Sequence, residues 1–416
     1  MKIGILLIVS FTSLVSQARI LTWTECIELA KQRNSDLQIA LDNLRATEAL
    51  ETVSASQFFP QISGVLSGTE SNSISSTMDS GLGRTYSAQL NLRQNLFAGF
   101  SDLSKLRQAK ANTSSLRANL QIAKAKLSND LKQAYESLRY ANEFERMAKD
   151  IQIRREKNLR IVELRFESGR ENKGSVLLSK AYFEQAKYDQ QQAHHQIETA
   201  QAQLASILGL NKTELEITDK IPLKEPPTLR PPFENILVGV PDYALLQSQK
   251  VSADYEVDLN KSAFYPSLDL NANTGKTDST FFPEQDRWSV GLSLTIPFFN
   301  GGRDWGSTRS AASKSMAALH ALEGGKLQIL VTLEKAFETY VESVDKLRVD
   351  QAFEKAQSVR AEIARTKYNN GLMTFEDWDQ VENDLISRQK TLLISQRDRV
   401  LNESAWDQAQ GIGVIP

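Results

Sequence analysis

The feature that most constrains this chain is a long stretch without any residue that breaks a helix. No glycine lies between Gly99 and Gly169 and no proline between Pro60 and Pro222, so residues 100–168 contain neither of these strong helix breakers. Apolar residues recur there in steps of three and four, at Leu116, Leu120, Ala123, Leu127, Leu131, Ala134, Leu138 and Ala141. This spacing is typical of a coiled coil. It predicts one helix from Ser101 to Glu167, about 100 Å long at 1.5 Å per residue.

The second half of the chain repeats the first. An offset of 202 residues superposes Leu90 on Leu292, Gly99 on Gly301 and Gly169 on Gly371, and an offset of 206 superposes the corner at Pro60 on that at Pro266. Six of the eleven prolines fall between Pro222 and Pro241. Self-similarity at a fixed period indicates a structural repeat. We therefore predict a first repeat over 19–210, a proline-rich linker over 211–241 and a second repeat over 242–416.

Shorter helices accompany each long one. Asp36 to Gln57 and Ser175 to Leu208 are each about half the length of the long helix, so two of them end to end match it. In the second copy the long helix is expected from about Trp305 to Asn369, with a local loosening at Gly324-Gly325. A return helix is expected from Phe375 to Gln408, which puts the turns at Gly169 and Gly371.

Four segments alternate apolar and polar residues as half-buried strands do. They form two predicted hairpins, whose polar loops are expected over Thr69 to Thr85 and Gly275 to Arg287. Strands of about 10 residues flanked by aromatic residues match a tilted membrane strand. An ordinary soluble sheet remains the alternative. The residues expected to face lipid are Leu90, Leu92, Leu268, Leu270, Leu292 and Leu294, while Asn271 and Ser293 are expected to point inward.

Four strands cannot close a barrel, and open edges are not tolerated in lipid. Chains must therefore combine. Two chains would give eight strands, whose interior is filled by side chains, whereas three chains give twelve strands around a channel. The polar inner face favours the homotrimer.

Composition and the chain start indicate an exported protein. Residues 1–18 combine Lys2, an apolar run and small residues at Ser16 and Ala18, which predicts a cleaved signal peptide. Arg19 follows the predicted cut, so no cysteine is available there to carry a lipid. The 49 Lys and Arg against 51 Asp and Glu give no basic surface for nucleic acid.

Taken together, these residues resemble the TolC-like outer-membrane efflux protein family over the whole mature chain. The resemblance is carried by the opening Leu21 to Ala30 with Asn34 to Leu37, the corners at Pro60 and Pro266, the glycines Gly99 and Gly301, and the turn Tyr368-Asn369-Asn370-Gly371. It implies a mainly α-helical chain with membrane β-structure, forming a trimeric 12-stranded outer-membrane β-barrel continuous with a long periplasmic α-helical barrel. It also implies an exit duct for an inner-membrane transporter coupled through a periplasmic adaptor, in tripartite efflux or type I secretion. A periplasmic adaptor and a structural coiled-coil envelope protein are the alternatives.

The resemblance also implies functional residues at the hairpin turns. Tyr368 and Gly371 match the family's aperture, and Asp377 matches a carboxylate that lines it. Members often carry a basic residue and a second acid where this chain has Met373 and Gln380; Asp379 or Glu376 could replace the acid. The alternative for Asp377 is an acid that complements a helix dipole.

The same turns are the family's meeting points with the adaptor. This implies contacts at Gly169, Arg170, Gly174 and Ser175 in the first copy and at Gly371 and Thr374 in the second. The adjacent His194 and His195 point about 100° apart on a helix and His320 stands alone in the sequence, which predicts no metal site. No catalytic motif is present, and we expect neither an enzyme nor a cofactor.

Overall fold

The computed structural model describes residues 19–72, 82–211 and 214–415, so the predicted signal peptide lies outside the described residues. The chain divides into two compact units. The sheet unit comprises residues 39–121 and 237–329. The hairpin unit comprises the described parts of residues 1–38, 122–236 and 330–416.

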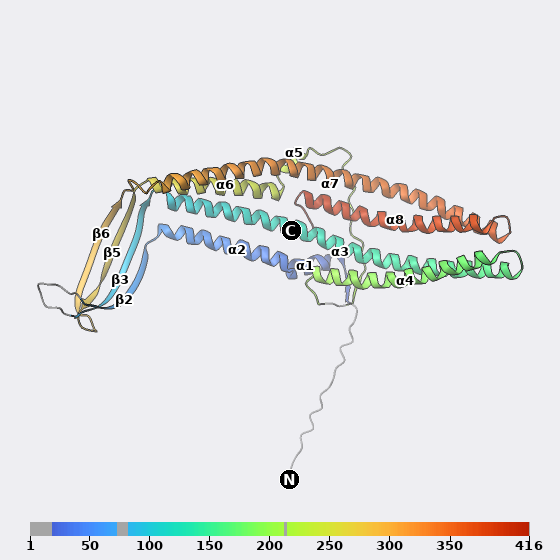
Figure 1. Cartoon of the computed structure of the whole chain (residues 1–416), viewed down its shortest axis with the longest axis horizontal. Helices are drawn as coiled ribbons and strands as arrows, with labels where there is room; N and C mark the ends of the chain where they lie inside the picture. The colour runs from blue at the N-terminus through green and yellow to red at the C-terminus, as the bar shows by residue number, and fades with distance from the viewer. Residues whose placement is uncertain (1–18, 73–81, 212–213, 416) are drawn as a thin grey trace, which may run out of the picture. The chain divides into compact units, whose positions relative to one another are not determined.

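Helices dominate the fold, and their lengths repeat along the chain (Figure 1). The long helices α3 (Ser101–Glu167) and α7 (Arg303–Asn369) have 67 residues each. The return helices α4 (Lys173–Ile207) and α8 (Phe375–Ala409) have 35 each, and α2 (Ser35–Ala55) and α6 (Pro241–Lys261) have 21 each. The prediction of one helix from Ser101 to Glu167 is confirmed. Among the described residues, no helix is both long enough and apolar enough to cross a membrane.

The expected loosening of the second long helix is wrong. Helix α7 continues without a break through Gly324 and Gly325. A Cβ atom at Gly325 would lie 2.3 Å from Cδ1 of Leu246 on α6. The glycine therefore makes room for a neighbouring side chain while the backbone hydrogen bonds of the helix continue past it.

The sheet unit contains an antiparallel sheet in the order β2-β3-β5-β6. Its strands are β2 (Gln61–Asn72), β3 (Leu82–Ala98), β5 (Ser267–Asp278) and β6 (Gln285–Thr295). The strands extend into the segments predicted as loops: in the second hairpin only residues 279–284 separate β5 from β6. The strands continue past the apolar residues from which they were predicted, because polar residues there also pair across the strands, as Lys276 does with Asp286.

The register places the predicted lipid-facing leucines on one face of the sheet. Leu270 lies opposite Leu292 and Leu268 opposite Leu294, while Leu90 and Leu92 lie opposite Thr274 and Ala272. Residues directly opposite each other share a face. A shift in register between Asn95 and Phe97 brings Phe97, in place of Leu96, opposite Leu268. The other face carries polar rows such as Ser63, Asn91, Asn273 and Ser289.

Strand β3 leads into the long helix α3 through Gly99. Gly99 has a φ of +61°, and a Cβ atom there would lie 2.6 Å from the carbonyl oxygen of Ser262 and 2.7 Å from Cβ of Tyr265. Both the left-handed backbone and the close approach therefore require glycine. Ser262 belongs to the short 3₁₀ helix η2 (Ser262–Phe264), whose counterpart in the first copy is η1 (Ser56–Phe58).

The hairpin unit contains short elements that the sequence did not predict individually. Strand β1 (Arg19–Leu21) pairs in parallel with β4 (Leu215–Ile217). Helix α1 (Trp23–Arg33) begins with a capping box between Thr22 and Glu25. Helix α5 (Phe233–Leu237), which lies in this unit up to residue 236, directly follows Pro231 and Pro232. Within this unit α3 runs beside α4, and α7 beside α8 (Figure 1).

Candidate aperture at the hairpin tips

The two hairpins of the hairpin unit end in turns of the same construction. Gly169 and Gly371 have φ values of +72° and +74°. The amide of Arg170 donates to the carbonyl of Arg165 at 2.8 Å, and that of Leu372 donates to the carbonyl of Lys367 at 2.8 Å. This is the Schellman pattern, in which a left-handed glycine ends a helix. Both turns therefore lie at the predicted positions, Gly169 and Gly371.

Tyr368 is completely buried beside the second turn. Its hydroxyl donates a hydrogen bond to Oε2 of Glu171, in the turn of the other hairpin, at 3.0 Å. Its ring stacks on Trp378, with centroids 4.2 Å apart and planes 10° apart. Burial, and then the bond to the Glu171 carboxylate, raises the pKa of Tyr368 well above its usual range. The hydroxyl therefore stays protonated and able to donate.

Arg165 of α3 holds Tyr368 from the opposite side of the ring. Its guanidinium lies 4.5 Å from the ring centroid, and its Nη1 donates to the Tyr368 carbonyl oxygen at 2.6 Å. That carbonyl is in the last turn of α7, where a cation is favourable. Tyr368 is thus enclosed between Arg165 and Trp378, and its contacts come from both hairpins.

An apolar cluster supports this arrangement. It joins the end of α7 to the beginning of α8 and includes one residue of α3. Its buried members are Val162, Ala361, Ala364, Tyr368, Phe375, Trp378, Val381 and Leu385. Side chains in such a packed cluster have few alternative positions.

Asp377 lies in the exposed first turn of α8. Its amide donates to Oγ1 of Thr374 at 3.1 Å, and the Thr374 hydroxyl donates to Oδ2 of Asp377 at 2.8 Å. Asp377 therefore takes part in capping the helix and also presents a carboxylate to solvent, so both sequence interpretations of this residue remain open.

Asp379 and Glu376, which could replace the second acid that family members carry where this chain has Gln380, differ in exposure. Asp379 is turned toward α3, where Nη1 of Arg155 lies 3.3 Å from its Oδ1. Burial raises the pKa of Asp379, and Arg155 opposes that rise. Gln380 is exposed and donates to Oδ1 of Asp384 at 2.9 Å. Glu376 is exposed next to Asp377.

The first turn is polar, as expected, but its residues differ in exposure. Gly169, Arg170 and Gly174 are exposed, whereas Ser175 is 4% exposed. The Ser175 amide donates to Oδ1 of Asn172, which caps α4, and its hydroxyl donates to Oε1 of Glu171 at 3.0 Å. In the second turn Gly371 and Thr374 are exposed.

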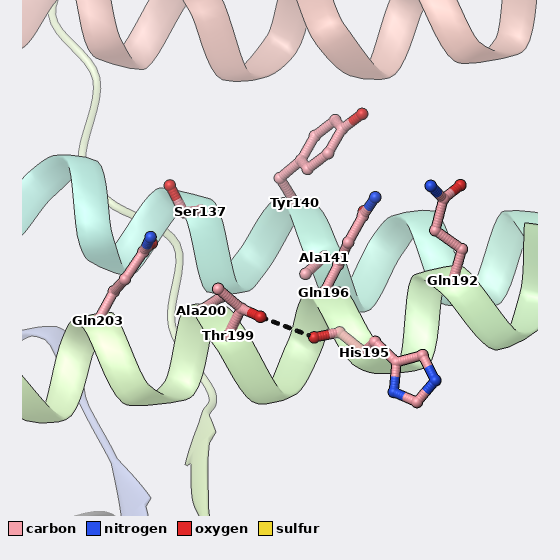
Figure 2. Close-up of a pocket in the computed structure, with 9 residues that line it drawn as sticks. All are labelled: Ser137, Tyr140, Ala141, Gln192, His195, Gln196, Thr199, Ala200 and Gln203. Atoms are coloured by element: carbon pink, nitrogen blue, oxygen red, sulfur yellow. Dashed lines mark hydrogen bonds between the residues drawn. The ribbon is translucent and has the colours of Figure 1, made fainter.

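The histidines are also on helix surfaces. Nδ1 of His194 lies 3.3 Å from a carboxylate oxygen of Glu145, and that of His195 lies 3.7 Å from one of Glu198. His195 borders a shallow pocket of about 330 Å³ between α3 and α4, and in Figure 2 its ring points away from that of Tyr140. Within the described part of the chain, no group of three His, Cys, Asp or Glu residues is placed to hold a metal ion.

Comparison with known proteins identifies the family. The model of the family described as "Outer membrane efflux protein" matches residues 26–210 and 236–411. The chain belongs to this family. The resemblance to TolC-like efflux proteins is therefore confirmed, and the chain is an outer-membrane efflux channel of a Gram-negative bacterium. Membership of this family favours the channel over the two alternatives, a periplasmic adaptor and a structural coiled-coil envelope protein.

Individual relatives agree. The solvent efflux pump outer membrane protein SrpC of Pseudomonas putida is 24% identical, over 93% of this chain and 84% of its own length. The alkaline protease secretion protein AprF of Pseudomonas aeruginosa is 28% identical over 48% of this chain and 44% of its own length. The Campylobacter jejuni CmeC outer membrane channel has the same fold, with a TM-score of 0.85 at 19% identity over 93% of this chain and 85% of that one.

In this efflux channel the sequence pattern indicated Tyr368 but not the residues that its side chain contacts. Arg165, Glu171 and Trp378 were not singled out, because their contacts to Tyr368 join residues of different elements. One signal was available: at the 202-residue offset Tyr368 corresponds to Phe166 and Trp378 to Val176. The second tip is therefore the more aromatic of the two.

Proposed function

We propose that three copies of this chain form a single exit duct, in which the sheet units build a 12-stranded barrel and the long helices continue it as a helical barrel. The observation that carries this proposal is a sheet of four strands with one apolar face and two open edges. Within the described residues, β2 pairs only with β3 and β6 only with β5. Open strand edges are not tolerated in lipid, and pairing β6 of one copy with β2 of the next would remove them all.

The division into repeats supports the same plan. A first repeat over 19–210, a linker over 211–241 and a second over 242–416 give each copy two hairpins of strands and two long helices. Threefold association then yields twelve strands, an even number within the usual range of outer-membrane barrels.

The partners in this proposal are a periplasmic adaptor and an inner-membrane transporter. The names of the relatives SrpC and AprF refer to a solvent efflux pump and to protease secretion, which agrees with a duct that serves tripartite efflux or type I secretion. The exposed tip residues Gly169, Arg170, Gly174, Gly371 and Thr374 would meet the adaptor. Ser175 would act indirectly, by holding Glu171 and the start of α4.

Closure of the duct is assigned to the tips. Tyr368, Gly371 and Asp377 belong to the aperture in this proposal: Tyr368 ties the second hairpin to the first, Gly371 forms the turn, and Asp377 lines the opening. Three copies of Asp377 around one axis would favour cations, because a ring of like charges stabilises a counter-ion.

Two adjacent residues of β6 test the barrel. Leu292 is on the leucine face and Ser293 on the polar face. We expect Leu292→Lys to cost about 2 to 4 kcal/mol if it lies near the midplane of the membrane, and Ser293→Lys to cost little because it points into the lumen. Heat-resistant trimer recovered from outer-membrane fractions is the measurement. Equal yields for the two variants, or the absence of any trimer in the unaltered protein, would contradict the proposal.

A further inference from the structure

The proline-rich linker is fixed to the helices of the hairpin unit. The hydroxyl of Tyr135 on α3 donates to the carbonyl of Asp219 at 2.7 Å, and Ile221 is buried. The next fixed point is Lys224, whose carbonyl accepts hydrogen bonds from the hydroxyl of Tyr340 on α7, at 2.5 Å, and from Arg399 on α8, at 3.1 Å. A segment held by three different helices is more than a loose tether between the repeats.

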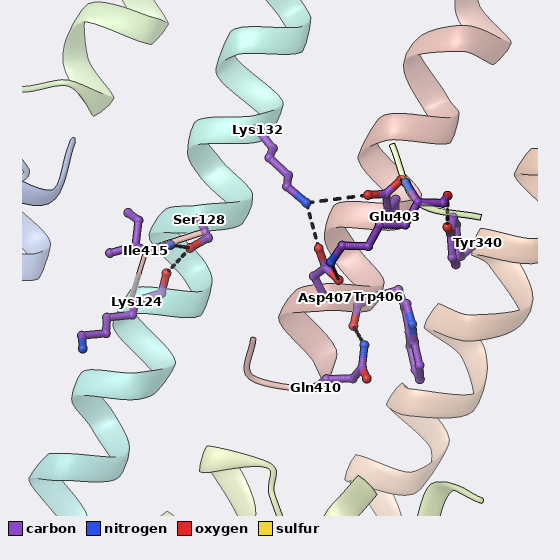
Figure 3. A network of polar contacts seen from close by, with 10 residues as sticks. Lys124, Ser128, Lys132, Tyr340, Glu403, Trp406, Asp407, Gln410 and Ile415 are labelled. Carbon is purple, nitrogen blue, oxygen red and sulfur yellow. Dashed lines mark hydrogen bonds and ion pairs between the residues drawn. The ribbon is translucent and has the colours of Figure 1, made fainter. Parts of the chain in front are cut away.

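A group of buried charged residues on α3 and α8 lies next to Lys224. Glu403 and Asp407, one turn apart on α8, are 2% and 6% exposed. Lys132 of α3 is 4% exposed and reaches between them: its Nζ lies 2.8 Å from Asp407 and 4.0 Å from Glu403 (Figure 3). One buried cation therefore faces two buried carboxylates, which leaves one negative charge unbalanced.

Lys224 adds a second positive charge from the solvent side of this group, because its own side chain is 66% exposed while that of Asp407 is 8% exposed. Its backbone N–H donates to Oε2 of Glu403 at 3.0 Å, and its ammonium lies 3.4 Å from Oδ1 of Asp407. A buried ion without a partner is strongly unfavourable, whereas a paired and hydrogen-bonded one is tolerated. Burial raises the pKa of Glu403, and the Lys224 amide and Lys132 oppose that rise. The docked linker thus completes the charge balance of the α3–α8 contact.

We infer that Lys224 is a positioning residue that docks the linker and holds the C-terminal end of α8 against α3. The two helical hairpins would then stay packed together at the linker while they separate at their tips. The location fits this role, because Lys132 precedes Arg165 by 33 residues on α3 (165 minus 132), about 50 Å along the helix. This inference rests on the proposed aperture at the tips.

Hydrogen exchange on the intact protein in detergent micelles tests the docking. We expect Lys224→Met, which removes the ion pair with Asp407, to speed exchange of the 219–225 amides and of the last turns of α8 at least tenfold. Lys220→Met, at a second exposed linker lysine, should leave both unchanged. Lys224→Arg should keep the protection. The decisive variant is Lys224→Met combined with Glu403→Gln, which restores the charge balance and should recover most of the protection. If Lys224→Met behaves like Lys220→Met, or if Glu403→Gln recovers nothing, the assignment is overturned.

The same measurement separates the fixed end from the aperture. Arg165→Met should speed exchange at residues 366–376 and leave 219–225 within twofold of the unaltered protein. Faster exchange at both ends would show that the linker end is not fixed, and would overturn this inference alone. Unchanged exchange at the tip would instead refute the proposed aperture, while the docking of Lys224 would still be judged by the charge-balance variants.

Discussion

The two hairpin tips share one backbone design but use different side chains. Both end in a left-handed glycine with the same hydrogen bonds, at positions 202 residues apart. The first tip carries Phe166, which is 43% exposed, where the second carries the fully buried Tyr368. The first contributes Arg165 and Glu171, where the second has Lys367 and Met373. The two tips are therefore complementary: one provides the aromatic group, and the other provides its polar partners.

This complementarity makes the contact between hairpins asymmetric. Tyr368 is bonded to the first hairpin through its hydroxyl, its ring face and its carbonyl. Phe166 has no hydroxyl with which to make the reverse contact. Substitutions at equivalent positions of the two tips should therefore have unequal effects, which provides matched controls for the tip variants.

The largest effect is expected from Trp378→Ala. Trp378 is 1% exposed and stacks on Tyr368, so its removal leaves a cavity in the apolar cluster and should destabilise the tip by about 3 to 5 kcal/mol. The equivalent change in the first tip is Val176→Ala, at a smaller and only partly buried side chain, and should cost less than half as much. Hydrogen exchange at the start of α8 gives the local stability. Similar losses for the two variants would mean that the tips are not specialised.

Arg165→Met should have the next largest effect. It removes a charged hydrogen bond to the Tyr368 carbonyl and a guanidinium over its ring, and a hydrogen bond to a charged group contributes about 1.5 to 3 kcal/mol. Conductance in planar bilayers should rise clearly. The control is Lys367→Met, at the equivalent and exposed residue of the second tip, which should leave conductance unchanged. A rise of equal size in the control would contradict the asymmetric contact.

Tyr368→Phe should open the channel less than Arg165→Met does. The phenylalanine ring remains between Arg165 and Trp378, so the guanidinium over the ring is kept and only the bond to the Glu171 carboxylate is lost, at a cost of about 1.5 to 3 kcal/mol in each chain. Phe166→Tyr adds a hydroxyl to an exposed ring and should change nothing. If Tyr368→Phe raises conductance more than Arg165→Met, the Tyr368 hydroxyl is the principal tie between the hairpins and Arg165 is secondary.

The fold could be predicted far into its details because the controlling signals are periodic or positional. The stripe of apolar residues and the absence of glycine and proline set the limits of α3, and the glycines Gly169 and Gly371 set the turns. Alternation placed Leu270 and Leu292 on one face of the sheet. Where a glycine serves a neighbour, as Gly325 serves Leu246, the same signal led to a wrong expectation, because composition does not say what lies beside a helix.

The site could be predicted only in part. Tyr368 was recognisable from a family pattern, but its partners were not, because contacts such as that of Arg165 with Tyr368 depend on how two helices come together across a separation of 203 residues. Burial is equally hidden: Ser175 and Lys132 are polar residues on helices, and nothing local distinguishes them from exposed neighbours. The network around Lys224 joins segments from both repeats and the linker, so it cannot be predicted from any one of these segments alone.

The smallest effect on stability, and the sharpest test of the aperture, is expected at Asp377. The substitution Asp377→Asn removes a charge and keeps a side chain that can still accept a hydrogen bond from Thr374, so the helix start and the pore size should be preserved. Cation preference should fall, because a ring of three carboxylates around the axis would be lost. Glu376→Gln is the control: it removes another exposed carboxylate one residue away, about 100° around the helix, and should alter selectivity less. Reversal potentials in a salt gradient measure the difference. If the two variants shift the reversal potential equally, or only Glu376→Gln shifts it, then Asp377 does not line the aperture and serves to cap α8.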